Sequence, residues 1–265
     1  MEAPVNAPEP ATAIDADELT EKVKRMYRDV ARHPGADYHF ELGRGLAERL
    51  GYPVDALDRI PTGAVDSFAG VGYFFDLADL SEGEHVIDFG SGSGMDTFVA
   101  AQHVGWTGRV VGIDMTKEQL TKASALARSA HVPNLWYLKA YLEDVPCVDE
   151  SFDAAISNGV FNLAADKRAA FREVARVLRS GGRMAISDIV SEAQLPLSIT
   201  CDTTYWASCI GGAMQIDDYV AAIEASGLRV QTVRDNPEYR FLSRGAAGAM
   251  DAHGVKSISL LAAKP

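Results

Sequence analysis

Short apolar runs alternate with stretches of helical periodicity through the middle of this 265-residue chain. The runs that we interpret as strands cover residues 85–89, 109–114, 135–140, 152–157 and 183–188. Helices are expected from the turn after residue 89 through Val104, over 117–129 and over 167–178, with Gly181-Gly182 as the C-cap of the last one. Strands that alternate with helices are typical of β–α–β units. The pattern therefore predicts an α/β fold with a Rossmann-like, doubly wound, mainly parallel sheet.

The two ends of the chain follow other patterns. Apolar residues recur at helical spacing from Leu19 to Val30, and a second helix is expected from Phe40 to Leu50, so we predict an N-terminal helical cap. The regular alternation stops after Asp188, and residues 195–212 are interpreted as an insertion. A helix over 217–226 and strands over 228–233 and 256–262 then predict a C-terminal antiparallel hairpin.

Composition and charge narrow the class of ligand. The chain is 47% apolar and 23% charged, as in ordinary globular proteins, and 25 Lys and Arg stand against 37 Asp and Glu, for a formal net charge of −12. Such an acidic surface disfavours nucleic acid as the main partner and favours a small molecule. No apolar run approaches the ~20 residues of a membrane span, and the start has no signal pattern, so we expect a cytoplasmic protein without a membrane partner.

The Cys and His residues predict no metal site. Cys147, Cys201 and Cys209 are odd in number and have no CxxC spacing, which excludes a disulfide framework and a zinc knuckle. The six histidines have no metal-ligand spacing, and no Ser-His-Asp or HExxH pattern is present. Free thiols are the simplest state of the cysteines.

A glycine-rich turn carries the strongest chemical signal. Residues 88–96, DFGSGSGMD, follow a predicted strand and open a helix, so glycine backbone can approach a ligand at a helix N-terminus. Asp114 ends the next strand, twenty residues after Gly94, where a carboxylate can bind ribose hydroxyls. An ordinary glycine turn, and an N-cap role for Asp114 or Thr116, are the structural alternatives. The turn reads GxGxG rather than the GxGxxG of nicotinamide enzymes, which favours S-adenosylmethionine (SAM).

Several motifs in order resemble the class I SAM-dependent methyltransferases: DFGSGSGMD, VVGIDMT, SFDAAISNGVFNL and VLRSGGRMAISDI, within residues 65–230. The resemblance implies that SAM lies on the turn formed by Gly90, Ser91 and Gly92, with Asp88 near its methionine amino end. It also implies roles for residues after the later strands: Asp114 at the ribose, Met115 beside the adenine, Leu142 and Glu143 at the adenine edge, and Asn158 near the transferred methyl group.

More narrowly, the chain is similar to the arsenite methyltransferases through GIDMTKEQL, ISNGVFNLAADK, GGRMAISDI and WASCIGGAM. These enzymes hold trivalent arsenic with cysteine thiolates, because a soft centre prefers sulfur ligands. The resemblance makes Cys209 an arsenic ligand. Where the family commonly has two further cysteines, this chain has Val71 and Gly159, so Cys201, eight residues before Cys209, is the candidate for a second thiolate, with Cys147 a remote third. Each cysteine is open to the alternative of a small buried apolar residue.

Aromatic residues flank both predicted sites. In the segment 66–76, DSFAGVGYFFD, Phe68 or Tyr73 is a candidate lid over SAM, or packs the cap on the sheet. Tyr205 and Trp206 either shape a sulfonium pocket or fill the core. We therefore expect a mobile tail at 1–17, a helical cap and lid segment at 18–80, a SAM-binding core at 81–190, and an acceptor-site insertion with the C-terminal strands at 191–265.

The leading hypothesis is a SAM-dependent methyltransferase that acts on a small acceptor, trivalent arsenic first, with Cys209, Cys201 and Asn158 at the reaction centre. In-line methyl transfer depends mainly on orientation, so few catalytic side chains are expected. The alternatives are an organic acceptor (a thioether or thiol sulfur, an amine or a hydroxyl), a nicotinamide-dependent reductase, and a non-catalytic module that binds SAM or arsenicals. The oligomeric state stays open.

Overall fold

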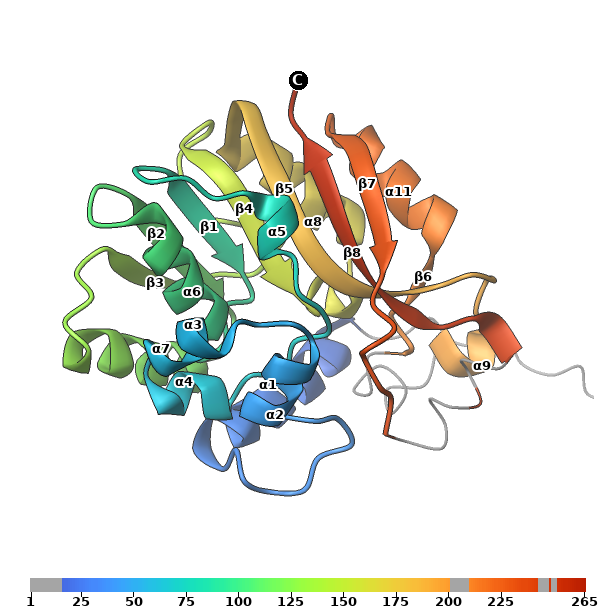
Figure 1. Cartoon of the computed structure of the whole chain (residues 1–265). Helices are drawn as coiled ribbons and strands as arrows, with labels where there is room; N and C mark the ends of the chain where they lie inside the picture. Colours follow the sequence, from blue (N-terminus) through green and yellow to red (C-terminus); the bar gives the residue numbers. More distant parts are fainter. Residues whose placement is uncertain (1–15, 201–209, 243–247, 249–251) are drawn as a thin grey trace, which may run out of the picture.

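In this computed structural model, which describes residues 16–200, 210–242, 248 and 252–265, the strands form one twisted, eight-stranded sheet (Figure 1). The order is β3-β2-β1-β4-β5-β8-β7, and β6 pairs with the end of β5. The strands are β1 His85–Phe89, β2 Arg109–Asp114, β3 Leu135–Lys139, β4 Phe152–Asn158, β5 Leu178–Ser191, β6 Met214–Gln215, β7 Arg229–Asp235 and β8 Lys256–Ala263. β1 to β5 run parallel, and β8 is antiparallel to β5 and β7. The predicted mainly parallel sheet with a C-terminal antiparallel pair is confirmed.

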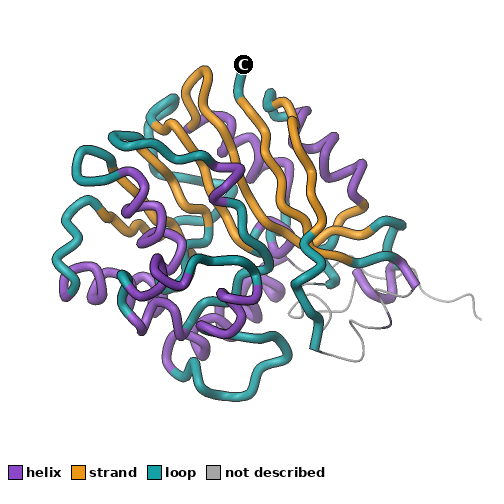
Figure 2. The backbone as a smooth tube through the Cα atoms, in the orientation of Figure 1, coloured by secondary structure: helices purple, strands orange, loops and turns teal. Residues whose placement is uncertain are grey.

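Helices cover both faces of the sheet, which makes three layers (Figure 2). On one face α6 and α7 pack with the N-terminal helices, and on the other α8 and α11 pack around Phe171 and Tyr219. The helices are α1 Ala16–Arg32, α2 Arg44–Arg49, α3 Val54–Asp58, α4 Thr62–Asp66, α5 Phe75–Ala78, α6 Met95–Val104, α7 Lys117–Ser129, the 3₁₀ turn η1 Phe161–Leu163, α8 Lys167–Val177, α9 Leu197–Thr200 and α11 Ile216–Ala225.

Coverage on both faces explains why the central strands read as continuous apolar runs. Residues 152–157 of β4 are all buried, and four of the five residues of β1 are buried. The edge strand β3 is buried only at Leu135 and half-buried at Tyr137. Parallel strands with helices on both sides need apolar side chains on both faces, and an edge strand does not.

Two local predictions were wrong. Gly181 and Gly182 do not cap a helix: α8 ends at Val177, and β5 begins at Leu178. The register between β4 and β5 shifts from Phe152↔Leu178 to Ala154↔Arg183, so the two glycines lie in an irregularity of the strand, with Gly181 at φ +79°. The helix expected over 40–50 is reduced to α2, and α3, α4 and α5, which were not expected, follow it.

The N-terminal helices lie at the end of the sheet where the parallel strands finish (Figure 1). α1 packs along α7: the side-chain amide of Gln119 donates to the Tyr27 carbonyl at 3.0 Å, and Arg32 pairs with Glu118 at 3.0 Å. In open parallel sheets ligands bind at this end, where the strand order reverses. Here it reverses at β1, which lies between β2 and β4. No helix of the described residues has the length and apolar composition to cross a bilayer.

Candidate functional site

The glycine-rich turn between β1 and α6 is built into the end of the sheet. The N–H groups of Gly90 and Ser91 donate to the Ile113 carbonyl at 2.8 and 2.9 Å, which joins the turn to β2. Gly90 has φ +75°, and a Cβ atom there would lie 2.5 Å from the Val160 side chain. Only glycine fits this backbone conformation in this space, and the backbone is thereby left open toward the ligand side.

Asp114, at the end of β2, accepts hydrogen bonds from the glycine-rich turn and from the residue that precedes α7. Its Oδ2 accepts a hydrogen bond from Gly92 N at 3.0 Å, and its Oδ1 accepts one from Thr116 N at 2.7 Å. Burial raises the pKa of Asp114, and these two N–H groups oppose that rise. Thr116 precedes α7, but its side chain makes no capping hydrogen bond, so the alternative of an N-cap role is not supported for Thr116. The Thr116 side chain also hydrogen-bonds to Asp114, and a carboxylate with about four lone-pair sites and these three donors keeps acceptor capacity for a ligand.

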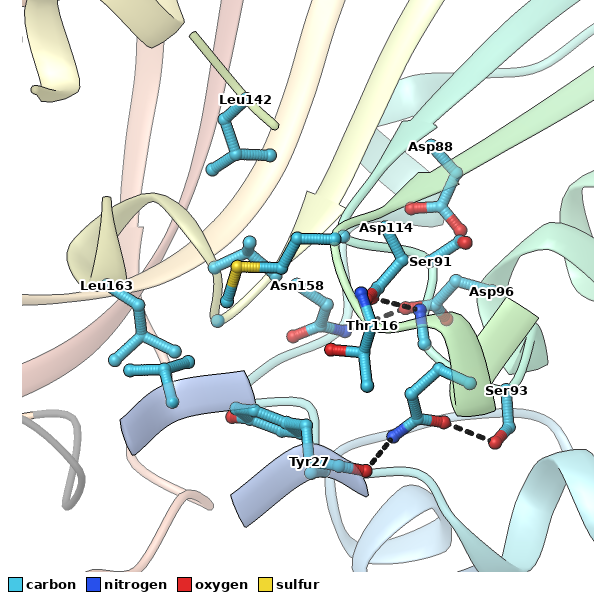
Figure 3. Close-up of a pocket in the computed structure, with 18 of the residues that line it drawn as sticks. Tyr27, Asp88, Ser91, Ser93, Asp96, Asp114, Thr116, Leu142, Asn158 and Leu163 are labelled. Atoms are coloured by element: carbon cyan, nitrogen blue, oxygen red, sulfur yellow. Dashed lines mark hydrogen bonds between the residues drawn. The ribbon is translucent and has the colours of Figure 1, made fainter. Parts of the chain in front are cut away.

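A pocket opens between this turn, α1 and the segments after β3 and β4, and encloses about 1080 Å³, counting its open mouth (Figure 3). It is lined by every described residue that the sequence assigned to SAM or catalysis: Asp88, Gly90, Ser91, Gly92, Asp114, Met115, Leu142, Glu143 and Asn158. Thr20, Val23 and Tyr27 of α1 form another part of the wall. The sequence showed α1 as an amphipathic helix but carried no signal that it covers this pocket.

The charged residues that line the pocket are all acidic. Asp88, Asp96, Asp114 and Glu143 line the pocket, and none of the described residues that line it is Lys, Arg or His. Asp88 and Asp96 are buried, and their burial raises the pKa of each carboxyl, that of Asp96 to about 6. Two buried polar atoms of the wall, Asp88 Oδ2 and Ser91 Oγ, have no hydrogen-bond partner among the residues that the structure describes. Such a wall fits a ligand that brings positive charge and donors.

Asn158 at the end of β4 organises the floor of the pocket. Its Oδ1 accepts from the backbone N–H of Val71 at 2.7 Å and of Gly72 at 3.3 Å. Its Nδ2 donates to Asp96 Oδ2 at 3.1 Å, Tyr52 Oη at 3.0 Å and the Gly72 carbonyl at 3.0 Å. The amide is therefore engaged by the protein, and Asn158 positions its neighbours.

Sequence reasoning missed Asp96 and Tyr52 as members of this site. Asp96 lies in the first turn of α6, directly after the glycine-rich turn, where an acid is favoured by the helix dipole, so its position carried a usable signal. Tyr52 carried none, because it lies 44 residues before Asp96, in the cap. Of the two lid candidates, Phe68 lines the pocket, and Tyr73 packs against Tyr52 with ring centroids 5.0 Å apart.

The acceptor side is only partly described. Val71 and Gly159 are neighbours: a Cβ atom on Gly159 would lie 3.1 Å from Val71 Cγ1, and Val71 is buried in an apolar cluster. Cys147 is a half-buried free cysteine that does not line the pocket, and burial raises the pKa of its thiol. The other predicted residues of this side lie outside the described residues: Cys201, Tyr205, Trp206 and Cys209.

Comparison with known proteins assigns this fold and pocket to a family. Residues 80–230 match the family described as "Methyltransferase domain". The chain belongs to this methyltransferase family. Its relatives include the arsenite methyltransferase of Halobacterium salinarum, 34% identical over 239 residues, and that of Mus musculus, 30% identical over 227 residues. These matches cover 84% and 82% of this chain, and the chain spans 61% and 60% of the two relatives.

Similar solved structures include that of another arsenic methyltransferase. The arsenic(III) S-adenosylmethionine methyltransferase of Chlamydomonas reinhardtii is 28% identical to this methyltransferase-family chain, with a TM-score of 0.68. The match covers 80% of this chain and 72% of that one. A geranyl diphosphate C-methyltransferase of Streptomyces coelicolor, 18% identical with a TM-score of 0.68, shows the same fold over 97% of this chain.

Proposed function

We propose that this chain is an enzyme that transfers the methyl group of SAM to a small acceptor, and that the acceptor is trivalent arsenic. The assignment of SAM as the methyl donor rests on the acidic wall of the pocket. SAM brings a sulfonium and an ammonium cation to a wall of four acids. A nicotinamide dinucleotide would place two phosphate groups against the same acids without a Lys, Arg or His among the described wall residues, which disfavours the reductase.

The residues of the wall fit the parts of SAM. The remaining acceptor capacity of Asp114 suits the ribose hydroxyls, and Met115 and Leu142 offer apolar contacts for the adenine. The unpartnered atoms Asp88 Oδ2 and Ser91 Oγ suit the methionine portion. When bound, SAM supplies an electrophilic methyl group on a sulfonium sulfur.

The chain's own contribution is orientation and the exclusion of water. α1 and Phe68 cover the pocket, and Asn158 holds the backbone of residues 71–72 beside it. The lone pair of trivalent arsenic needs no deprotonation before it accepts a methyl group, so no general base is required. Asn158 then acts as a positioning residue, because its amide is engaged by the protein.

The arsenic acceptor is supported by the two relatives described above, both of which are named arsenite methyltransferases, and by the soft thiols of the insertion. We assign Cys209 and Cys201 as the arsenic ligands. The net charge of −12 supports a small molecule rather than nucleic acid as the partner, and we propose a cytoplasmic location, where thiols stay reduced.

The test is the formation of S-adenosylhomocysteine (SAH) by purified protein with SAM, a reduced thiol and arsenite, against the same mixture without acceptor. We expect arsenite-dependent SAH that falls at least about tenfold in Cys209→Ser and Cys201→Ser. Cys147→Ser is the matched control, since Cys147 lies off the pocket, and it should keep the activity. SAM binding without turnover on any acceptor would favour a binding module, and tight NAD(P) binding without SAM binding would favour the reductase.

One observation favours a second acceptor class. Val71 and Gly159, at positions where the family commonly carries thiols, are adjacent and apolar in this structure. A small organic acceptor with a thioether or thiol sulfur, an amine or a hydroxyl suits such a wall. SAH formation that depends on an organic thiol and does not respond to arsenite or to Cys209→Ser would establish this alternative.

A further inference from the structure

Residues 71–73 lie on the side of the pocket where the acceptor is expected. They lead from the cap into α5, which lies over β5, and their backbone belongs to no helix or strand (Figure 1). Gly70, directly before them, lines the pocket, and so does Gly159, which lies beside Val71. Val71 itself packs in an apolar cluster with Ile210 of the predicted insertion. The position of this backbone therefore sets the room that an acceptor has.

Hydrogen bonds from two sides hold Val71. Its N–H donates to Asn158 Oδ1 at 2.7 Å, at the end of β4, and its carbonyl accepts from Ser257 Oγ at 2.6 Å, on β8. The Ser257 hydroxyl has one hydrogen, and Asn236 Nδ2 donates to its oxygen at 3.0 Å, which leaves that hydrogen for the Val71 carbonyl. Asn236, directly after β7, therefore sets the direction of the hydrogen bond from Ser257.

Two further serines hold Asn236 in turn. Asn236 Oδ1 accepts from Ser259 Oγ at 3.0 Å, and Ser259 Oγ lies 2.8 Å from Ser187 Oγ on the neighbouring strand β5. The side chains of Ser187, Asn236, Ser257 and Ser259 are all buried. Buried polar groups cost stability unless they are hydrogen-bonded, and a connected cluster of them fixes one geometry more sharply than apolar packing does. This cluster therefore suits a role in positioning.

The close fit at Gly72 is a separate observation. A Cβ atom there would lie 2.2 Å from Asn236 Nδ2 and 2.6 Å from Ser187 Oγ. The backbone of the segment thus passes directly against the serine and asparagine cluster, and only glycine allows this approach. A shift of the cluster would move the segment, and the Val71 side chain with it.

We propose that Ser257 and Asn236 are positioning residues for the methyl acceptor, because they fix Val71 through its carbonyl. This inference rests on the proposed function, since it takes the acceptor to bind on this side of the pocket. Both side chains lie behind the described wall of the pocket, so they act through Val71 and not by contact with the acceptor. In-line methyl transfer depends on orientation, and a displacement of about 1 Å can cost about a hundredfold in rate.

The test is the steady-state kinetics of SAH formation from SAM and arsenite, with glutathione as the reduced thiol. If arsenite is inert, benzenethiol replaces it as the acceptor. In Ser257→Ala, which removes the hydrogen bond to the Val71 carbonyl, the KM for the acceptor should rise at least about fivefold. The Kd of SAM, measured by calorimetry, should stay within about twofold of wild type. A purely structural role would lower the amount of folded protein, and hence kcat, but would leave the acceptor KM unchanged.

Asn236→Asp is the second variant, because it keeps the shape of the side chain and replaces the Nδ2 donor by an acceptor. The Ser257 hydroxyl should then turn to the carboxylate and release the Val71 carbonyl, which should raise the acceptor KM by about threefold or more. Ser157→Ala is the matched control. Ser157 is also a buried strand serine that donates to a backbone carbonyl, that of Phe89 at 2.7 Å, but at the end of β1. Its loss should leave the acceptor KM unchanged.

The outcomes separate this inference from the proposed function. If wild-type protein forms no SAH with either acceptor, the proposed function and the inference both fail. If it forms SAH, but the acceptor KM is unchanged in Ser257→Ala and Asn236→Asp or rises equally in Ser157→Ala, the function stands and the inference is wrong. If one of the two variants does not fold, as judged by its thermal melting curve, the other decides.

Discussion

Tyr219→Phe probes a buried charge behind the pocket wall. Asp188, within β5, is 1% exposed, and its Oδ2 accepts from Tyr219 Oη at 2.6 Å and from Asn162 N at 2.9 Å. Its Oδ1 accepts from Ile189 N at 2.8 Å. The phenylalanine keeps the ring that packs on Phe171 and removes only the hydroxyl.

The expected loss follows from the charge and burial of the acceptor. A hydrogen bond to a charged group contributes about 1.5–3 kcal/mol, and in the variant Asp188 keeps its two backbone donors from the described part of the chain, Asn162 and Ile189. We therefore expect the free energy of unfolding to fall by about 2 kcal/mol at pH 7.5, where Asp188 is ionised. A neutral carboxyl makes weaker hydrogen bonds, so at pH 5 the loss should be about 1 kcal/mol.

The sign of the pH dependence is fixed by the direction of the pKa shift. Burial raises the pKa of Asp188 from 3.8 to about 6, opposed first by Tyr219 and then by the backbone N–H of Ile189 and by Lys167. Between those values the folded protein binds more protons than the unfolded chain, so this group's stability contribution is lost as pH rises through about 6. Without the Tyr219 hydroxyl the pKa of Asp188 rises further, so the total loss of stability becomes larger and extends to higher pH.

Urea unfolding of wild type and Tyr219→Phe at pH 5 and pH 7.5 measures both effects. Tyr137→Phe is the control, because its hydroxyl donates to a neutral partner, Thr97, and its effect should be the same at the two pH values. A Tyr219→Phe loss below about 0.5 kcal/mol at pH 7.5, or an equal loss at both pH values, would refute the reasoning that a buried anion is the acceptor.

Three further outcomes are expected. Gly90→Ala should cost about 1–3 kcal/mol more than Gly92→Ala in urea unfolding, because both have positive φ but only the Cβ at Gly90 meets a side chain at 2.5 Å; equal losses would contradict this. Burial lowers the pKa of Lys167 to about 8, so its contribution to stability is lost as pH falls through 8. The free energy of unfolding of the wild type should therefore rise between pH 8 and 10, and this rise should be smaller in Lys167→Met. The double variant Val71→Cys with Gly159→Cys should form SAH faster than wild type in the presence of arsenite. The φ of +71° at Gly159 should lower the stability of this variant by about 1 kcal/mol. An unchanged rate would argue against arsenic binding between these positions.

The sequence by itself determined the sheet and which residues of the candidate site lie on it. Asp88, Asp114 and Asn158 each lie at or near the end of a strand with a clear apolar pattern. Because parallel strands finish at one edge of a sheet, their order along the chain was enough to bring these residues together. The glycine-rich turn was readable for the same reason, since its spacing and the helix after it are local features.

Only the tertiary structure decided which side chains close the site. Tyr52 reaches Asp96 and Asn158 across 44 and 106 residues of chain, and Tyr27 joins the pocket through the packing of α1 on α7. No periodicity links residues at such separations, because their contact depends on how the cap packs on the sheet. The glycine pair Gly181-Gly182 is a local example of the same limit. A glycine pair after a helix predicts a C-cap, but both glycines lie in β5, which pairs with β4. Contacts between elements are chosen by packing and hydrogen bonding of the whole chain, which a local pattern does not contain.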